Sequence, residues 1–125
     1  MKTILLVDDN ETDQFLHEVV VEKFDPSIRI LKAYDGHEAL EKITAFDGKI
    51  DVIFLDINMP GMNGFEFLGE YNKRPSPSSV VVMLSSSKQE SDKEKALAYD
   101  FVKEYVAKPL AIQNLENLSQ NLVKD

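Results

Sequence analysis

Five apolar runs of strand length alternate along this chain with five longer segments of helical period, and this alternation constrains the fold more than any other feature. The runs predicted to form strands are Thr3–Val7, Ile28–Ala33, Val52–Leu55, Val80–Leu84 and Tyr105–Ala107. All but the second and the last are nearly continuous apolar runs, which is typical of parallel strands covered on both faces. Parallel strands joined by right-handed crossovers predict an α/β protein, a doubly wound (βα)5 sandwich.

The segments between these runs have the apolar spacing of helices. We predict helices over Thr12–Phe24, Gly36–Phe46, Gly64–Tyr71, Asp92–Tyr99 and Ile112–Val123. The stripe expected to face the core from the first helix consists of Phe15, Leu16, Val19, Val20 and Lys23. Asp35 is the predicted N-cap of the second helix. The stripe of the last helix favours docking on the sheet over a role as a dimer face.

Composition limits the class of protein. A chain of 125 residues with 43% hydrophobic and 29% charged residues predicts one globular domain over residues 1–125. No apolar run approaches the roughly 20 residues of a membrane span, and the N-terminus lacks signal-peptide anatomy, so we expect a cytoplasmic protein without membrane insertion. The net charge of −8 argues against a nucleic-acid partner, and the absence of cysteine excludes disulfides and thiolate metal sites.

Polar residues follow four of the predicted strands directly. Asp8 and Asp9 follow the first, Asp56 the third, Ser85 the fourth and Lys108 the fifth. Because ligands bind at the carboxyl ends of parallel strands, these side chains are expected to converge. Three carboxylates, a hydroxyl and an ammonium suit a divalent metal and a phosphoryl group, with one carboxylate left to be phosphorylated.

Each of these signals also has a simpler explanation. An acid after the first strand can cap the next helix, although Asn10 or Thr12 could do so instead. Ser85 lies in a turn-like serine run, and a lysine before Pro109 is usually exposed. Three carboxylates this close would repel one another unless a cation lay between them, and Mg²⁺ prefers such oxygen ligands. A plain turn does not explain an ionised Asp56 after four apolar residues; such a carboxylate can act as a nucleophile toward phosphorus.

With these motifs the chain resembles the response regulator receiver domain of two-component signalling along all 125 residues. The matching motifs are Val7-Asp8-Asp9, the segment with Asp56, Met59, Pro60 and Gly64, the hydroxyl of Ser85, and Lys108-Pro109. The resemblance implies a flavodoxin-like sandwich whose five-stranded parallel sheet has the order 2-1-3-4-5. It also implies a cis bond between Lys108 and Pro109.

The same resemblance assigns roles to the site residues. It makes Asp56 the phosphoacceptor, with Ser85 and Lys108 contacting the phosphoryl group. It implies Mg²⁺, with Mn²⁺ as an alternative, held by Asp9, Asp56 and the backbone carbonyl of Asn58, and by Asp8 through water. Ser85 and Tyr105 would form the conformational switch. Asn58 and Ser87 would flank the path of the attacking water and influence autodephosphorylation.

The chain departs from the family pattern in two places. Asp100-Phe101-Val102 replaces a common Gly-Ala pair before the last strand, and Ser85 replaces the commoner threonine. Neither change removes a group that the site needs.

The function expected is that of a receiver without an output domain. It would accept a phosphoryl group from a sensor histidine kinase or a histidine phosphotransfer protein and then control a partner protein. It would catalyse only its own phosphorylation and dephosphorylation, as a monomer or as a dimer formed on phosphorylation. The alternatives are an interaction module that ignores phosphate and an enzyme. Two features count against an enzyme. Asp8 and Asp9 would repel the FMN phosphate that a flavodoxin binds after its first strand. A haloacid-dehalogenase-type phosphatase needs a second aspartate two residues after its nucleophile, and this chain has Asn58 there.

Overall fold

Five strands and five helices alternate in the computed structural model, which describes residues 1–75 and 77–121. The strands are β1 (Thr3–Val7), β2 (Arg29–Ala33), β3 (Val52–Leu55), β4 (Val80–Ser85) and β5 (Val102–Ala107). The helices are α1 (Glu11–Phe24), α2 (Gly36–Ala45), α3 (Gly64–Asn72), α4 (Glu90–Leu97) and α5 (Ile112–Asn121). All strand pairs are parallel and the sheet order is β2-β1-β3-β4-β5, which confirms the predicted fold and strand order.

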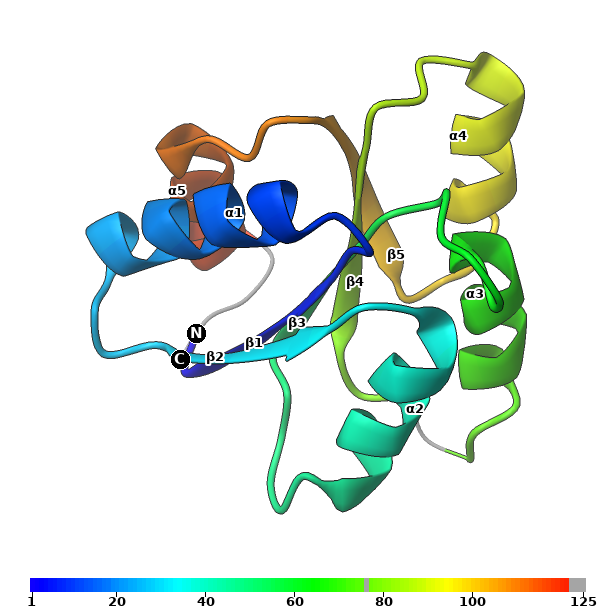
Figure 1. Ribbon diagram of the computed structural model, residues 1–125, viewed down its shortest axis with the longest axis horizontal. Coiled ribbons are helices and arrows are strands. Elements are labelled where there is room, and N and C mark those ends of the chain that lie inside the picture. Colours follow the sequence, from blue (N-terminus) through cyan, green and yellow to red (C-terminus); the bar gives the residue numbers. More distant parts are fainter. Residues whose placement is uncertain (76, 122–125) are drawn as a thin grey trace.

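Helices cover both faces of the sheet. Helices α1 and α5 lie on one face, and α2, α3 and α4 lie on the other (Figure 1). Successive residues of a strand point to opposite faces, so the central strands need apolar side chains at every position. In β3, Val52 and Phe54 belong to the core under α1 and α5, whereas Ile53 and Leu55 belong to the core under the other helices. Burial of each such side chain contributes about 1.5–3 kcal/mol.

The predicted core face of α1 is wrong at Phe15 and Leu16, whereas Val20 of the same stripe packs against the core. Phe15 and Leu16 are 62% and 48% exposed, and the buried residues of this helix are Gln14, His17 and Val21. Gln14 explains this rotation, because its Nε2 donates to the carbonyls of Leu6, Asp8 and Ala33 at 3.1, 3.1 and 2.9 Å. These carbonyls lie where β1 and β2 end, so a buried amide sets the orientation of the helix.

The other differences concern element boundaries. β5 begins at Val102 rather than Tyr105, since Val102 pairs with Val81 beside an irregularity in the register. As an edge strand it tolerates the charged residues that follow Val102. Helix α4 begins two residues earlier than predicted, at Glu90. Residues 122–123, predicted as the end of the last helix, lie outside the described residues. Within the described part of the chain, no helix is long and apolar enough to cross a membrane.

The turn between β3 and α3 brings backbone against backbone. The N–H of Gly64 donates to the carbonyl of Ile57 at 2.8 Å, and Asn63 and Glu66 form a capping box at the start of α3. A Cβ on Gly64 would lie 2.4 Å from the carbonyl oxygen of Asp56 and 2.9 Å from Cα of Ile57. The absence of a side chain at position 64 therefore lets α3 begin directly against the segment that carries Asp56.

We predict that Gly64→Ala lowers the free energy of unfolding by roughly 2 kcal/mol, because the new methyl group meets backbone atoms that cannot move aside. Urea denaturation of the purified variant measures this loss. Gly69→Ala is the matched control, because its Cβ would meet only Tyr99 Oη at 3.9 Å. It should stabilise α3 by about 0.5–1 kcal/mol. Equal stability of the two variants would contradict this account of the turn.

Candidate functional site

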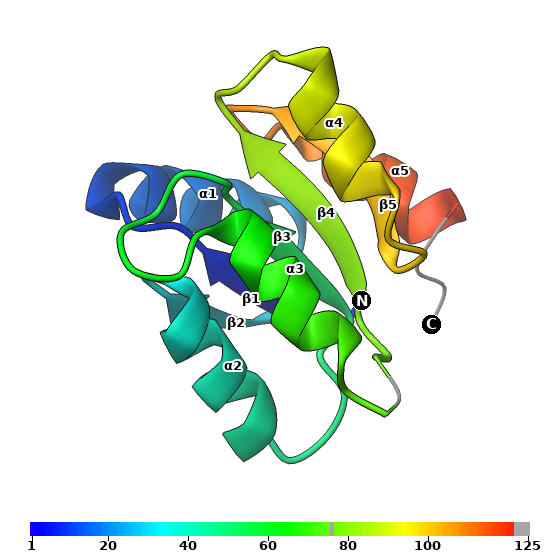
Figure 2. The same ribbon diagram turned by 90° about the vertical axis from the view of Figure 1, so that its right-hand side faces the viewer.

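Three carboxylates meet at the carboxyl end of the sheet. Asp8 and Asp9 follow β1, and Asp56 follows the adjacent strand β3, whose Leu55 is in register with Val7. One ligand oxygen from each carboxylate lies within 4.8 Å of the other two. Asp8 and Asp56 are 4% and 5% exposed, while Asp9 is exposed. Figure 2 shows the end of β1, the start of α1 and the loop after β3 gathered at this end of the sheet.

Backbone hydrogen bonds hold two of the carboxylates. Oδ1 of Asp8 accepts the N–H of Asn10 at 2.9 Å, and Oδ1 of Asp56 accepts the N–H of Ile57 at 2.8 Å. Asn10 itself is the N-cap of α1, accepting the N–H of Asp13 at 2.9 Å. The capping role considered for Asp8 and Asp9 therefore falls to Asn10, which leaves the two carboxylates to the cluster.

Lys108 places an ammonium against this cluster. Its Nζ lies 2.7 Å from Oδ2 of Asp8 and 3.2 Å from Oδ2 of Asp56, and also 2.9 Å from Oδ2 of Asp13 in the first turn of α1. Its backbone N–H donates to the carbonyl of Ser85 at 3.0 Å, which ties the ends of β4 and β5 together. The bond between Lys108 and Pro109 is cis, as the family resemblance implied.

Burial and the neighbouring charges set the protonation of the site. Burial raises the pKa of Asp56, Lys108 lowers it and Asp8 raises it, and the net direction is upward. Burial lowers the pKa of Lys108, but its hydrogen bonds to Asp8 and Asp13 outweigh burial and raise the pKa overall. Burial lowers the pKa of His17, beneath the site in α1. Lys108 therefore stays protonated at neutral pH, whereas burial disfavours the charged form of Asp56.

The donor set fits a hard divalent cation. The three clustered side chains offer carboxylate oxygens only, and Mg²⁺ and Mn²⁺ favour oxygen ligands. Lys108 contacts Asp8 and Asp56 but is not paired with Asp9, so the exposed side of the cluster still carries uncompensated negative charge. His17 and His37 take no part in this cluster, and among the described residues it is the only group of potential metal ligands of this kind.

The loop after β4 links the two predicted switch residues, Ser85 at the end of β4 and Tyr105 in β5, through hydrogen bonds to Ser87. Ser85 is fully buried, and its Oγ accepts the N–H of Ser87 at 3.1 Å. The hydroxyl of Tyr105 donates to the carbonyl of Ser87 at 3.0 Å, and the hydroxyl of Ser87 donates to Asp92 of α4 at 2.6 Å. This loop therefore joins the end of β4 to both β5 and α4.

Two residues of the site escaped the sequence analysis. Asp13 contacts Lys108, and Gln14 holds the carbonyls at the ends of β1 and β2. Local sequence patterns indicated neither residue, since the contact of Asp13 with Lys108 joins positions 95 residues apart. Asn58 lies two residues beyond Asp56 with an exposed side chain, and the metal-binding role of its carbonyl stays a prediction.

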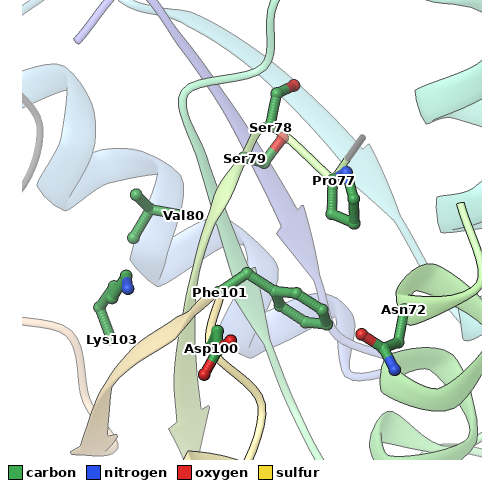
Figure 3. Close-up of a pocket in the computed structure, with 8 residues that line it drawn as sticks. All are labelled: Asn72, Pro77, Ser78, Ser79, Val80, Asp100, Phe101 and Lys103. Atoms are coloured by element: carbon green, nitrogen blue, oxygen red, sulfur yellow. The ribbon is translucent and has the colours of Figure 1, made fainter. Parts of the chain in front are cut away.

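A separate hollow of about 430 Å³ opens at the opposite end of the sheet (Figure 3). It is bordered by the end of α3, the segment before β4 and the start of β5, including Asn72, Ser79, Phe101 and Lys103. The acid cluster lies at the carboxyl ends of the strands, so this hollow does not belong to the candidate site.

Comparison with known sequences agrees with the geometry. A family model described as the response regulator receiver domain matches residues 4–120. Protein PilH of Pseudomonas aeruginosa is 32% identical over 116 residues, which cover 92% of this chain and 92% of PilH. Protein-glutamate methylesterase/protein-glutamine glutaminase 1 of Myxococcus xanthus is 36% identical over 104 residues, which cover 80% of this chain. The matched region spans only 29% of that longer relative.

Solved structures share the fold along nearly the whole chain. A two-component response regulator from Cytophaga hutchinsonii is 33% identical with a TM-score of 0.88, covering 96% of this chain and 95% of that one. The phosphorylated cyanobacterial phytochrome response regulator RcpA is 27% identical with a TM-score of 0.81, covering 98% and 96%. The Mn²⁺-bound form of response regulator Rcp1 is 25% identical with a TM-score of 0.80, covering 99% and 98%.

We predict that Asp56→Asn stabilises the metal-free protein at neutral pH by on the order of 1 kcal/mol, because it removes a buried negative charge. Lys108 keeps Asp8 and Asp13 as partners in this variant. Urea denaturation in EDTA over a range of pH measures the difference, and exposed Asp47→Asn is the control.

The pH dependence follows from the raised pKa of Asp56. Above this pKa the buried charge of Asp56 destabilises the wild-type protein. This destabilisation disappears as the pH falls through the raised pKa toward the ordinary aspartate value of about 3.9. The advantage of the variant should therefore be largest at neutral pH and vanish in acid. A variant less stable than the wild type at neutral pH would show that the carboxylate is not under electrostatic strain.

Proposed function

The chain belongs to the response regulator receiver domain family, and from this premise we propose that it accepts a phosphoryl group on Asp56. Phosphorylation of an aspartate is the general property of this family. The observation that carries the proposal is a buried Asp56 carboxylate held between two further carboxylates and the Lys108 ammonium. An ionised carboxylate needs no general base to attack phosphorus, and positioning and charge neutralisation dominate catalysis of such a transfer.

The proposed transfer is a single displacement at phosphorus. A carboxylate oxygen of Asp56 attacks the phosphorus of a partner's phosphohistidine, and the new P–O bond forms as the P–N bond breaks. The electron pair of that bond returns to the imidazole nitrogen. Hydrolysis ends the signal: a water oxygen attacks the phosphorus as the P–O bond to Asp56 breaks, the electron pair of that bond returns to the carboxylate, and inorganic phosphate leaves with the protons of the water. Lys108 and the hydroxyl of Ser85 are proposed to bind phosphoryl oxygens during both steps.

Asp9, Asp56 and the backbone carbonyl of Asn58 are proposed to hold Mg²⁺, with Asp8 acting through water. The ion would neutralise negative charge on the carboxylates and on the transferring phosphoryl group. Two observations support this assignment: the donor set holds oxygen atoms only, and Asp9 is exposed and forms no salt bridge with another described residue. The Mn²⁺-bound form of Rcp1 shows that a structural relative takes a divalent cation, and Mn²⁺ is accordingly an alternative here.

Ser85 and Tyr105 are proposed as the switch. A phosphorylated Asp56 carries about −1.5 to −2 charge in place of −1, and the Ser85 hydroxyl would turn toward it. Ser85 now accepts the N–H of Ser87, and Tyr105 and Asp92 bind Ser87 in turn. Movement of Ser85 would therefore change the loop that contacts α4 and β5. This is the kind of bistable element through which a local charge acts at a distance.

The partners proposed are a sensor histidine kinase or a histidine phosphotransfer protein upstream, and a protein target downstream. Residues 1–125 would act as one cytoplasmic receiver domain that catalyses only its own phosphorylation and dephosphorylation. A methylesterase activity belongs to a longer relative, of which this chain spans 29%, and no observation here favours it for this chain.

We predict that the protein gains one phosphoryl group from acetyl phosphate in the presence of Mg²⁺, and that EDTA prevents the gain. Intact-mass spectrometry measures the product. Asp56→Asn should not be phosphorylated, because it lacks the nucleophile, whereas exposed Asp47→Asn should match the wild type. An unmodified wild type, or equal modification of Asp56→Asn, would overturn the proposed function.

A further inference from the structure

Asp13 is the partner of Lys108 that the proposed chemistry does not use. It lies in the first turn of α1, outside the three-carboxylate cluster, and its Oδ2 accepts a hydrogen bond from Nζ of Lys108 at 2.9 Å. This contact is shorter than the 3.2 Å between Nζ and Asp56. The ammonium of a lysine has three N–H donors, and Lys108 contacts three carboxylates. No donor is left over for a further oxygen.

The three partners of Lys108 differ in how easily they could be released. The side chains of Asp8 and Asp56 are 5% and 7% exposed, whereas that of Asp13 is 32% exposed. A released carboxylate must be solvated, and a buried charge left without a partner is strongly unfavourable. Only Asp13 lies where water can replace the ammonium at low cost.

From these contacts we propose that Asp13 is a positioning residue that competes with the phosphoryl group for Lys108. The inference rests on the proposed phosphorylation of Asp56. In the unphosphorylated protein Asp13 holds the ammonium toward α1, together with Asp8. A phosphoryl group on Asp56 presents more negative charge than the carboxylate it replaces and draws the ammonium toward β3. The hydrogen bond between Lys108 and Asp13 then breaks.

Through this competition Asp13 lowers the rate at which Asp56 is phosphorylated. While Asp13 neutralises part of the ammonium charge, less of it stabilises the charge that develops on the transferring phosphoryl oxygens. Asp13→Asn keeps the size of the side chain and the backbone N–H that caps onto Asn10, but removes the competing charge. The α1 helix should remain in place, because Gln14 holds it to the ends of β1 and β2.

The test compares Asp13→Asn with Glu11→Gln, which removes the same charge from the same first turn at an exposed position that is not paired with Lys108. The rate of phosphorylation by acetyl phosphate with Mg²⁺ is followed by intact-mass spectrometry. In this reaction the Asp56 oxygen forms a bond to phosphorus as the bond to acetate breaks, and acetate leaves with the electron pair. Asp13→Asn should react about two- to fivefold faster than the wild type, the range expected for a partly exposed ion pair.

A second measurement needs neither metal nor phosphodonor. Exchange of the Lys108 ammonium protons with water, followed by ¹⁵N-edited NMR, should be faster in Asp13→Asn and unchanged in Glu11→Gln. A purely structural role of Asp13 would alter urea stability and leave this exchange in the folded protein as it is.

The outcomes separate this inference from the proposed function. A wild type that is not phosphorylated at all refutes the proposed function, and the exchange measurement then still decides whether Asp13 restrains Lys108. If the wild type is phosphorylated and Asp13→Asn is equally fast or slower, the competition is refuted. Equal acceleration by both variants would assign the effect to net charge at the start of α1 instead.

Discussion

Electrostatic balance among Asp8, Asp9, Asp56 and Lys108 is the constraint on which this site depends. Three carboxylate oxygens within 4.8 Å of one another repel strongly, and two of the side chains are nearly removed from water. The Lys108 ammonium, at 2.7 Å from Asp8 and 3.2 Å from Asp56, offsets part of that repulsion. Burial nevertheless keeps the pKa of Asp56 raised. The three carboxylates and one ammonium therefore leave the pocket with a net negative charge, which favours binding of a divalent cation.

The fold supplies this balance through strand order. Because β1 and β3 are neighbours, Asp8 and Asp56 emerge side by side, and the backbone N–H of Asp56 donates to Val7 at 3.0 Å. Lys108 directly follows β5, at the edge of the sheet, and its side chain reaches the cluster across the end of β4. Its backbone is held there by the carbonyl of Ser85. The loop that follows the end of β4 is hydrogen-bonded to Asp92 of α4 and to Tyr105 of β5.

The sequence predicted the architecture well because the central strands are apolar on both faces, a pattern that few other folds require. The convergence of Asp8, Asp9, Asp56 and Lys108 followed from their positions after strands. The orientation of α1 could not be predicted from hydrophobicity. A buried amide, Gln14, outweighs the exposed Phe15 and Leu16 because its Nε2 lies within hydrogen-bond distance of three carbonyls at the ends of β1 and β2. The contact between Asp13 and Lys108 likewise depends on a separation of 95 positions along the chain, which local patterns do not report.

The central claim is that the acid cluster is built around a metal ion, and anomalous diffraction from crystals grown with Mn²⁺ tests it most directly. The account predicts one strong peak between Asp9 and Asp56, at about 2 Å from an oxygen of each, as is usual for a small hard cation. It also predicts loss of that peak in Asp9→Asn crystals. Ordered carboxylates with no peak between them, or a peak confined to another part of the surface, would contradict the account.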